Sequence, residues 1–268
     1  MICCITNMSH TSLTFSSHLT AFKENQNTPW GKLRYGVGMA NIQKHFQAHN
    51  AQVLDVGSGT GLDAIPFAKQ GHEVTLLDYS GEMIEEAKRS AEEEGASERI
   101  TFHKGDIRSI PTLFPNTRFD LILCHNVLQY VDDINTAINM MSEALKPNGL
   151  LSIIAINRYS EPYRLALHQL DLDGALATLD AEMLRTAVFN TDVHAITVDD
   201  MREPLHTAGC AIEGDYGIRC VCDYIQNNEI KSDPTFFAKL EKLEYELSGR
   251  APYKNTARFF QVVARKIV

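Results

Sequence analysis

The chain has 268 residues, of which 44% are apolar and 22% charged, and its 25 basic and 34 acidic side chains give a formal net charge of −9. This composition is typical of a globular protein and excludes disordered, collagen-like and low-complexity chains. The negative charge argues against broad non-specific binding to nucleic acids or to anionic membranes.

The first predicted feature is a polar N-terminal segment. Residues 1–21 are rich in Ser, Thr, His and Asn without a clear period, so we predict a mobile tail followed by a single domain over residues 22–268. No basic residue precedes Lys23, and a secretory signal needs one, so we expect a cytoplasmic protein. Apolar positions three or four residues apart then predict a helix over residues 29–48.

Strands and helices alternate after this helix. The pattern predicts strands over 52–56, 73–77, 100–103, 119–124 and 150–156, with helices over 62–70, 82–94 and 134–145 between them. This alternation predicts right-handed crossovers and an α/β fold with a doubly wound sheet. The longest strongly apolar run, residues 150–156, is far shorter than the roughly 20 residues that span a bilayer. We therefore predict no membrane partner.

Residues 158–198 interrupt the alternation. Their leucines recur at helical spacing, so we predict a helical cap inserted over the carboxyl edge of the sheet. The remaining predicted elements are a helix over 198–208, a strand over 210–216, a helix over 234–247 and a strand over 258–265. Asp233 followed by Pro234 is a strong helix start, and Gly249 is a good helix stop.

The glycine-rich turn after the first strand is the most informative motif. It has the sequence Gly57-Ser58-Gly59-Thr60-Gly61-Leu62, and Asp78 ends the next strand 19 residues after Gly59. Glycines let a ligand approach the backbone closely, and an acid at this position can accept hydrogen bonds from both ribose hydroxyls. A dinucleotide fingerprint would have glycine where Leu62 stands, and a phosphate-binding Walker loop would need Gly-Lys-Ser/Thr. The pattern therefore predicts a nucleoside half-site.

This turn resembles motif I of the class I S-adenosylmethionine-dependent methyltransferases. The runs Gly105-Asp106-Ile107, Phe119-Asp120-Leu121-Ile122 and Leu145-Lys146-Pro147-Asn148-Gly149-Leu150 match later motifs of that family in order. The resemblance implies a Rossmann-like sheet that is mostly parallel with an antiparallel C-terminal strand. It also implies S-adenosylmethionine as cofactor and S-adenosylhomocysteine as product. The cofactor-binding residues that it implies are Asp55, Gly57, Ser58, Gly59, Asp78, Tyr79, Asp106 and Ile107.

A closer resemblance covers roughly residues 22–266. The segments Gly31-Lys32-Leu33-Arg34, 124–131 and 217–224, and the ending from Pro252-Tyr253 to Lys266, are similar to the bacterial tRNA 5-carboxymethoxyuridine methyltransferases. That subfamily methylates the carboxylate of a wobble uridine. The resemblance implies that Arg34 holds the methionine carboxylate of the cofactor and that His125 lines the cofactor pocket. The alternatives are an exposed helix arginine and a loop histidine that only packs.

The cap departs from that subfamily, which has a lysine-rich stretch here. Residues 157–200 carry 3 basic and 8 acidic side chains, and this charge would repel an anticodon stem-loop. The last twenty residues, in contrast, carry five basic side chains and no acid. We therefore expect a small-molecule acceptor, with tRNA as the alternative partner. A protein that binds S-adenosylmethionine without methyl transfer is the second alternative.

The acceptor decides which side chains would be catalytic. A carboxylate needs only a cation, for which Arg219 is the candidate because guanidinium binds carboxylate in a bidentate fork. Arg219 could instead form a salt bridge with Asp215 or Asp223. A hydroxyl or amine acceptor needs a base, for which His125 is the candidate.

Two tyrosines complete the predicted site. Tyr224 and Tyr253 could position a substrate, although half-buried packing is the alternative for both. We predict no metal site, because Asn126 and Asp132-Asp133 have ordinary loop or helix-cap roles. The sequence does not indicate an oligomeric state.

Overall fold

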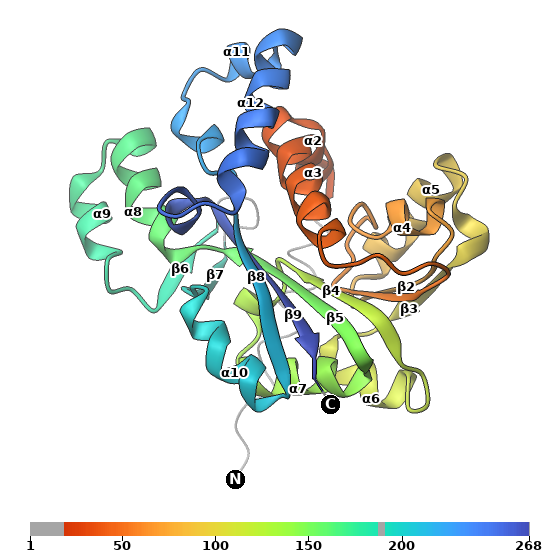
Figure 1. The fold of residues 1–268 in the computed structure, drawn as a ribbon. Helices are drawn as coiled ribbons and strands as arrows, with labels where there is room; N and C mark the ends of the chain where they lie inside the picture. The colour runs from red at the N-terminus through yellow and green to blue at the C-terminus, as the bar shows by residue number, and fades with distance from the viewer. Residues whose placement is uncertain (1–18, 187–190, 268) are drawn as a thin grey trace.

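A seven-stranded sheet organises the computed structural model, which describes residues 19–186 and 191–267 (Figure 1). Its strand order is β3-β2-β1-β4-β5-β9-β8. Strands β1 to β5 pair in parallel with one another, and β9 is antiparallel to both β5 and β8. The strands are β1 (Gln52–Val56), β2 (Glu73–Asp78), β3 (Ile100–Lys104), β4 (Phe119–His125), β5 (Leu145–Ile156), β8 (Cys210–Ile218) and β9 (Phe259–Lys266). The predicted doubly wound, mostly parallel sheet with an antiparallel C-terminal strand is thus confirmed.

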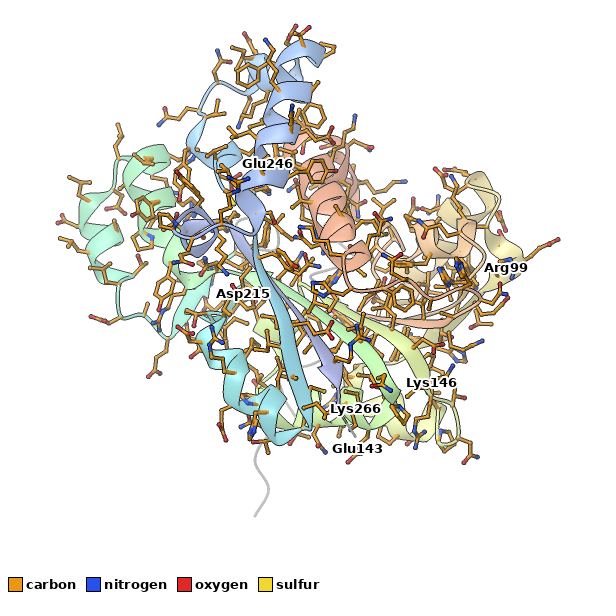
Figure 2. The ribbon with its side chains drawn as sticks, in the orientation of Figure 1. Arg99, Glu143, Lys146, Asp215, Glu246 and Lys266 are labelled. Carbon is orange, nitrogen blue, oxygen red and sulfur yellow. The ribbon has the colours of Figure 1, made fainter. Side chains whose placement is uncertain are left out.

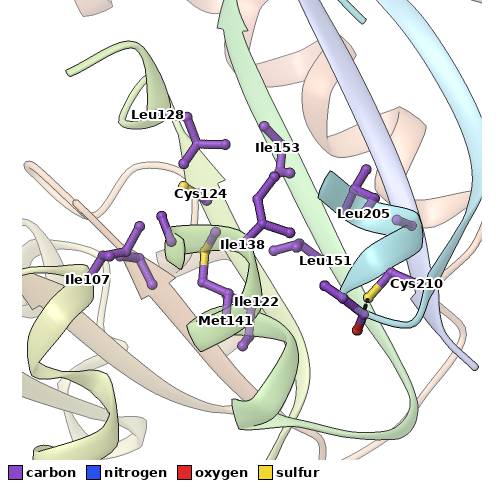
Figure 3. Close-up of a cluster of buried hydrophobic side chains, with 14 of the residues drawn as sticks. Ile107, Ile122, Cys124, Leu128, Ile138, Met141, Leu151, Ile153, Leu205 and Cys210 are labelled. Atoms are coloured by element: carbon purple, nitrogen blue, oxygen red, sulfur yellow. Dashed lines mark hydrogen bonds between the residues drawn. The ribbon is translucent and has the colours of Figure 1, made fainter. Parts of the chain in front are cut away.

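Apolar side chains cover both faces of this sheet, as expected for central parallel strands. Residues Leu151 and Ile153 of β5 face one cluster with Ile138 and Met141 of helix α7 (Ile134–Ala144) (Figure 3). Leu150 points into the cluster on the opposite face. The alternation follows from the two-residue period of a strand, so one apolar run supplies both cores.

Helices flank the two faces and begin where their capping residues stand. Ser80 accepts a hydrogen bond from Met83 N at the start of α5, and Asp233 accepts one from Phe236 N at the start of α12. Asp233 is the helix start that the sequence predicts, and α5 begins one residue before its predicted start. The helices are α3 (Pro29–Gln43), α4 (Ile65–Lys69), α5 (Gly81–Glu93), α6 (Ile110–Leu113), α7 (Ile134–Ala144), α10 (Arg202–Thr207), α11 (Asn228–Ser232) and α12 (Pro234–Ser248).

Helix α2 (Leu19–Asn27) lies across the glycine-rich turn. Gln26 Nε2 donates to Thr60 Oγ1 at 2.8 Å, and Lys23 forms an ion pair with Glu86 of α5. The helix begins at Leu19, so residues 19–21, which we predicted to belong to a mobile tail, are helical. The rest of the predicted tail lies outside the described residues.

Some predicted helices are shorter than expected. The helix predicted over 62–70 covers only Ile65–Lys69, because Gly61 turns the chain at a φ of +81° and Pro66 favours the first helical turn. The helix predicted over 198–208 is divided into the short turn Asp199–Met201 and α10.

The predicted cap is helical only in its first half. Helices α8 (Glu161–Arg164) and α9 (Leu172–Ala177) are joined by a π-helical turn. The second half contains an antiparallel hairpin of β6 (Met183–Arg185) and β7 (Asp192–His194). Leu184 and Val193 are the buried members of the two strands, so the inward pattern here has a strand period rather than a helical one. Val188, part of the predicted helical pattern, lies outside the described residues.

Candidate active site

The carboxyl ends of four parallel strands meet at one edge of the sheet. Gly57 follows β1, and His125 ends β4. Strand β8 runs parallel to β5, so Arg219 after β8 lies at the same edge, and Arg258 precedes the antiparallel β9 there. Ligands of open α/β sheets bind at this edge.

The glycine-rich turn at this edge requires glycine for steric reasons. Gly57 has a φ of +69°, and a Cβ added to it would lie 2.3 Å from Cγ2 of Val127. The Gly57 and Ser58 amides both donate to Leu77 O, at 2.7 and 3.1 Å. The turn is therefore held by backbone contacts that leave no space for a larger residue.

Asp78 connects this turn to the start of α5. Its Oδ2 accepts a hydrogen bond from Gly59 N at 2.8 Å, and its Oδ1 accepts one from Ser80 N at 2.9 Å. Burial raises the pKa of Asp78, and these amide hydrogen bonds oppose the rise. The carboxylate thus lies where the sequence analysis expects a ribose-binding acid.

Two buried polar atoms beside the turn have no protein partner. Asp55 Oδ2 and Ser58 Oγ receive no hydrogen bond from any described residue, although both residues are less than 10% exposed. Burial and the nearby charge of Asp63 raise the pKa of Asp55 well above its usual range. A buried polar atom without a hydrogen-bond partner costs free energy. The two oxygens beside the glycine-rich turn therefore suit a polar ligand, such as the methionine end of the cofactor.

Three of the predicted cofactor residues, Asp106, Ile107 and Tyr79, have partners or packing within the chain. Asp106 accepts a hydrogen bond from Arg108 N at 2.9 Å and forms a 2.5 Å ion pair with the Arg108 side chain. Burial raises the pKa of Asp106, but the Arg108 contacts outweigh it and leave the pKa lowered. Ile107 is buried in the core, and burial raises the pKa of the partly buried Tyr79. Within the chain, Asp106 thus caps the short 3-10 helix Ile107–Ser109.

Arg34, Asp63 and His125 form one buried ion cluster. Arg34 Nη1 lies 2.5 Å from both carboxylate oxygens of Asp63, and His125 Nδ1 lies 2.9 Å from Asp63 Oδ1. Burial raises the pKa of Asp63, but the charges of Arg34 and His125 outweigh it and hold the pKa well below its usual range. Burial lowers the pKa of His125 more than Asp63 raises it. Arg34 is therefore not an exposed helix arginine.

Sequence reasoning missed Asp63. Its only local signal is its position two residues after Gly61, on the glycine-rich turn itself. The partners that give it a role come from β4 and from α3, far away in the sequence. The structure therefore adds a carboxylate to the predicted cofactor residues.

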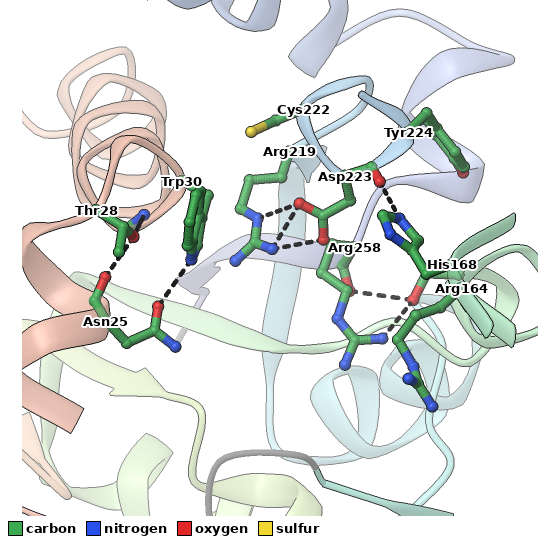
Figure 4. A network of polar contacts seen from close by, with 12 residues as sticks. Asn25, Thr28, Trp30, Arg164, His168, Arg219, Cys222, Asp223, Tyr224 and Arg258 are labelled. Atoms are coloured by element: carbon green, nitrogen blue, oxygen red, sulfur yellow. Dashed lines mark hydrogen bonds and ion pairs between the residues drawn. The ribbon is translucent and has the colours of Figure 1, made fainter. Parts of the chain in front are cut away.

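A second charged group surrounds a small pocket between the cap and the ends of β8 and β9 (Figure 4). Arg219 binds Asp223 through Nε at 2.7 Å, and Arg258 Nη1 donates to Glu161 Oε2 at 2.9 Å. Arg164 Nε also donates to Glu161, at 3.0 Å. We call these five side chains the arginine cluster. All of them except Glu161 line the pocket, together with Ser160, His168, Tyr224 and Thr256. The pocket has a volume of about 10 Å³, enough for about one water molecule.

This geometry decides between alternatives left open by the sequence. Arg219 pairs with Asp223, whereas Asp215 pairs with Lys254. Tyr224 lines the pocket and donates its hydroxyl to Thr256 O at 2.8 Å. Tyr253 is 50% exposed and is not among the residues that line this pocket. Arg164, Arg258 and Glu161, which sequence reasoning missed as site residues, complete the cluster.

Ion pairs largely neutralise the basic C-terminal segment, and two of the acidic partners, Asp215 and Glu246, are labelled in Figure 2. Arg250 lies 2.5 Å from Glu246, and Lys254 forms an ion pair with Asp215. Arg258 pairs with Glu161, and Arg265 pairs with Glu213. Four of its five basic side chains therefore have acidic partners, and the segment is a weaker phosphate-binding surface than its sequence indicates.

Within residues 19–186 and 191–267, no group of three or more His, Cys, Asp or Glu side chains could hold a metal ion. None of the helices in these same ranges has the length and apolar character required to cross a bilayer.

Comparisons with known proteins extend these observations. A model of a methyltransferase domain family matches residues 47–210. The tRNA 5-carboxymethoxyuridine methyltransferase of Escherichia coli (strain K12) is 30% identical over 251 residues, covering 89% of this chain and 90% of that protein. A ubiquinone biosynthesis O-methyltransferase of Rickettsia canadensis (strain McKiel) is 34% identical over 127 residues, 47% of this chain and 52% of that protein.

Solved structures share the fold at lower identity. The Burkholderia thailandensis 1,6-didemethyltoxoflavin-N1-methyltransferase, with bound 1,6-didemethyltoxoflavin and S-adenosylhomocysteine, superposes with a TM-score of 0.59 at 16% identity. The match covers 100% of this chain and 94% of that one. The overall fold is thus shared with a protein of low sequence identity.

Proposed function

Because this chain belongs to the class I S-adenosylmethionine-dependent methyltransferases, we propose that it transfers the methyl group to a carboxylate of a small organic acid. The observation that carries this proposal is the arginine cluster. Within the described part of the chain, Arg164, Arg219 and Arg258 pair with only two carboxylates, those of Asp223 and Glu161. A third carboxylate would balance its charge. Guanidinium groups bind carboxylates in a bidentate fork, which orients the acceptor as well as attracting it.

The residues around the glycine-rich turn fit the cofactor. Asp78 is the proposed ribose-binding acid, and Asp106 and Ile107 are proposed to lie along the adenine. Asp55 and Ser58 offer their unpaired oxygens to polar groups. The cofactor supplies a methyl group on a positively charged sulfur.

Arg34 is the proposed ligand of the methionine carboxylate. Its Nη1 is occupied by Asp63, and guanidinium has five N–H donors, so the contact with Asp63 leaves others for a ligand. Asp63 would then orient this arginine.

The proposed reaction is an in-line displacement. The acceptor oxygen forms a bond to the methyl carbon while the carbon–sulfur bond breaks, and that electron pair stays on sulfur. A carboxylate is ionised at neutral pH, so no proton has to be removed. The protein's part is to align the groups and exclude water, and the arginine cluster would hold the second carboxylate oxygen.

The position of the cluster agrees with this alignment. Strand β9 is two places from β4 in the sheet order, and neighbouring strands are about 4.8 Å apart, so Arg258 lies roughly 10 Å along the edge from the end of β4. An acceptor bound at the arginine cluster can therefore extend along this edge toward the proposed cofactor site. The present pocket is small, so binding would require Asp223 or Glu161 to share its arginine.

Two observations favour a small acid over a nucleic acid. The cap presents exposed Asp171, Asp173, Asp180 and Glu182 beside the site, and these would repel phosphates. The basic C-terminal segment, which could have opposed this effect, is largely paired with acids. In the same proposal, the protein acts in the cytoplasm.

The second candidate is methylation of a carboxylate on a tRNA wobble uridine. It is favoured by the similarity to the Escherichia coli tRNA 5-carboxymethoxyuridine methyltransferase, which extends over 89% of this chain. The two candidates share the same bond-forming step and differ only in what carries the carboxylate.

Labelled methyl transfer from S-adenosylmethionine into a cell extract, separated into tRNA and small-molecule fractions, tests the proposal. We expect base-labile label among small molecules. Base-labile label in tRNA, lost in high salt, would support the second candidate, and base-stable label would contradict carboxylate transfer. Label in neither fraction would favour binding without methyl transfer.

A pair of arginine variants tests the cluster itself. Arg219→Ala should reduce methyl transfer at least 100-fold with little change in cofactor affinity. Arg250→Ala is the matched control, because both arginines pair with an acid four residues away in the sequence. Equal activity of the two variants would contradict a role of the arginine cluster in binding the acceptor.

A further inference from the structure

A line of buried hydrogen bonds runs from His125 across the sheet. His125 Nε2 lies 2.9 Å from Ser152 Oγ of β5, and Gln261 Nε2 of β9 lies 3.0 Å from the same oxygen. Asn41 Nδ2 of α3 continues the line, 3.0 Å from Gln261 Oε1. Ser152, Gln261 and Asn41 are at most 1% exposed, so each polar group must find its partner within the protein.

The direction of these hydrogen bonds is fixed at the far end of the line. Gln261 Nε2 lies 3.1 Å from Gly38 O, a carbonyl that can only accept. Lys44 Nζ lies 2.9 Å from Asn41 Oδ1, and an ammonium can only donate. Both contacts require the amide of Gln261 to present its nitrogen to Ser152.

The donor and acceptor roles of Ser152 determine the role of His125 Nε2. Its oxygen accepts a hydrogen from Gln261, so its own hydrogen needs a separate acceptor. Among the described residues, the other partner of Ser152 Oγ is His125 Nε2. His125 Nε2 therefore accepts, and the proton of the neutral ring lies on Nδ1. This nitrogen is 2.9 Å from Asp63 Oδ1, although the ring is not aligned for a hydrogen bond to that oxygen.

We propose that Ser152 and Gln261 are positioning residues that fix His125 with its proton on Nδ1, and that this tautomer holds Asp63 and, through it, Arg34 in place for the cofactor. The inference rests on the proposed role of Arg34. Each ring nitrogen of His125 then faces a protein group, so His125 cannot also take a proton from an acceptor. This assignment replaces the expected general base with an orienting group.

The tautomer can be tested without cofactor by ¹⁵N NMR of the histidine rings in the full chain, with His125→Asn identifying the signal. We expect the Nδ1-protonated form in the unaltered protein. Ser152→Ala should shift the ring toward Nε2 protonation, whereas Ser152→Thr, which keeps the hydroxyl, should retain the original form. Protonation on Nε2 in the unaltered protein would overturn the proposal.

The effect on the site is measured by calorimetric binding of S-adenosylhomocysteine. Ser152→Ala and Gln261→Met should each weaken binding about tenfold. Ser142→Ala is the control, because Ser142 is also fully buried and loses a hydrogen bond to Ala208 O of 2.7 Å outside the line. Equal losses in all three variants would mean a general effect on stability and would contradict a positioning role.

These outcomes are separate from the proposed function. If the tautomer and product binding respond as expected but no carboxylate is methylated, the proposed acceptor is wrong and the positioning role stands. If Arg34→Ala binds S-adenosylhomocysteine normally, the role of the line in cofactor binding fails, whatever the acceptor is.

Discussion

The two ends of the site are built in different ways. At the cofactor end, backbone amides of Gly57 and Gly59 and the carboxylate of Asp78 connect residues within about one βαβ unit. At the acceptor end, Arg258 and Glu161 are 97 residues apart in the sequence and meet only because the cap lies beside β9. The proposed cofactor end thus depends on residues close together in the sequence. The proposed acceptor end depends on side chains that only the folded chain brings together.

Of the changes considered, one in the glycine-rich turn should have the largest effect on stability and on S-adenosylhomocysteine affinity. Gly57→Ala places a Cβ 2.3 Å from Val127 in a left-handed backbone, so we expect a penalty of about 3 kcal/mol and a loss of S-adenosylhomocysteine affinity near 100-fold. Calorimetry measures the affinity.

Gly95→Ala is the control for backbone strain alone. Gly95 has a φ of +66°, but an added Cβ would meet no atom within 4 Å. Its expected loss is about 1 kcal/mol of stability with unchanged binding. Similar losses of S-adenosylhomocysteine affinity in the two variants would show that steric contact with Val127 does not cause the loss.

The next largest effect is expected at the acceptor end. Glu161→Gln removes the buried partner of Arg164 and Arg258, so the free energy of unfolding should fall by about 3 kcal/mol. Urea denaturation at neutral pH measures it. Glu246→Gln, which breaks an exposed pair with Arg250, should change stability by only about 0.5 kcal/mol.

Acid titration of stability checks the same ion pairs. Burial raises the pKa of Glu161, but the hydrogen bonds from Arg164 and the charge of Arg258 leave it below the ordinary value of 4.5. A lowered folded-state pKa gives stability that is present above 4.5 and is lost as the pH falls through the folded-state value. Glu161→Gln should therefore lose less stability in acid than the unaltered protein. An identical acid profile would contradict this account.

The smallest expected effect is an increase in stability rather than a decrease. Asp55 is buried with a raised pKa, so its stabilising contribution is present at low pH and is lost as the pH rises through the folded-state value. Asp55→Asn should thus stabilise the cofactor-free protein by about 1 kcal/mol at neutral pH while weakening cofactor binding. Thermal unfolding measures the first effect, and a lower melting temperature would refute it.

Asp120→Asn provides the comparison for Asp55. Asp120 accepts from Gln52 N at 2.8 Å and pairs with Lys146 at 2.7 Å, so its charge is compensated. Its replacement should lower stability slightly rather than raise it.

The same contrast explains what the sequence could predict. The strands and the glycine-rich turn depend on short-range patterns, and the predicted doubly wound, mostly parallel sheet agrees with the structure. The ribose-binding role of Asp78 stays a prediction. Asp63 and Glu161 gain their roles from partners on other elements, which no local pattern contains. The hairpin in the cap was missed because its two strands are only three residues long, too short for a period to be distinguished.

Helix α2 links the folding of the N-terminal segment to the chemistry. Its nine residues are too few for a stable helix in water, so its order depends on contacts such as those of Gln26 with Thr60 and of the Phe22 ring with Gly59. Undocking and unwinding are thus expected to be one event, which would uncover the glycine-rich turn. Gln26→Ala, which removes the hydrogen bond to Thr60, is expected to make this opening more frequent and to speed the exchange of S-adenosylhomocysteine.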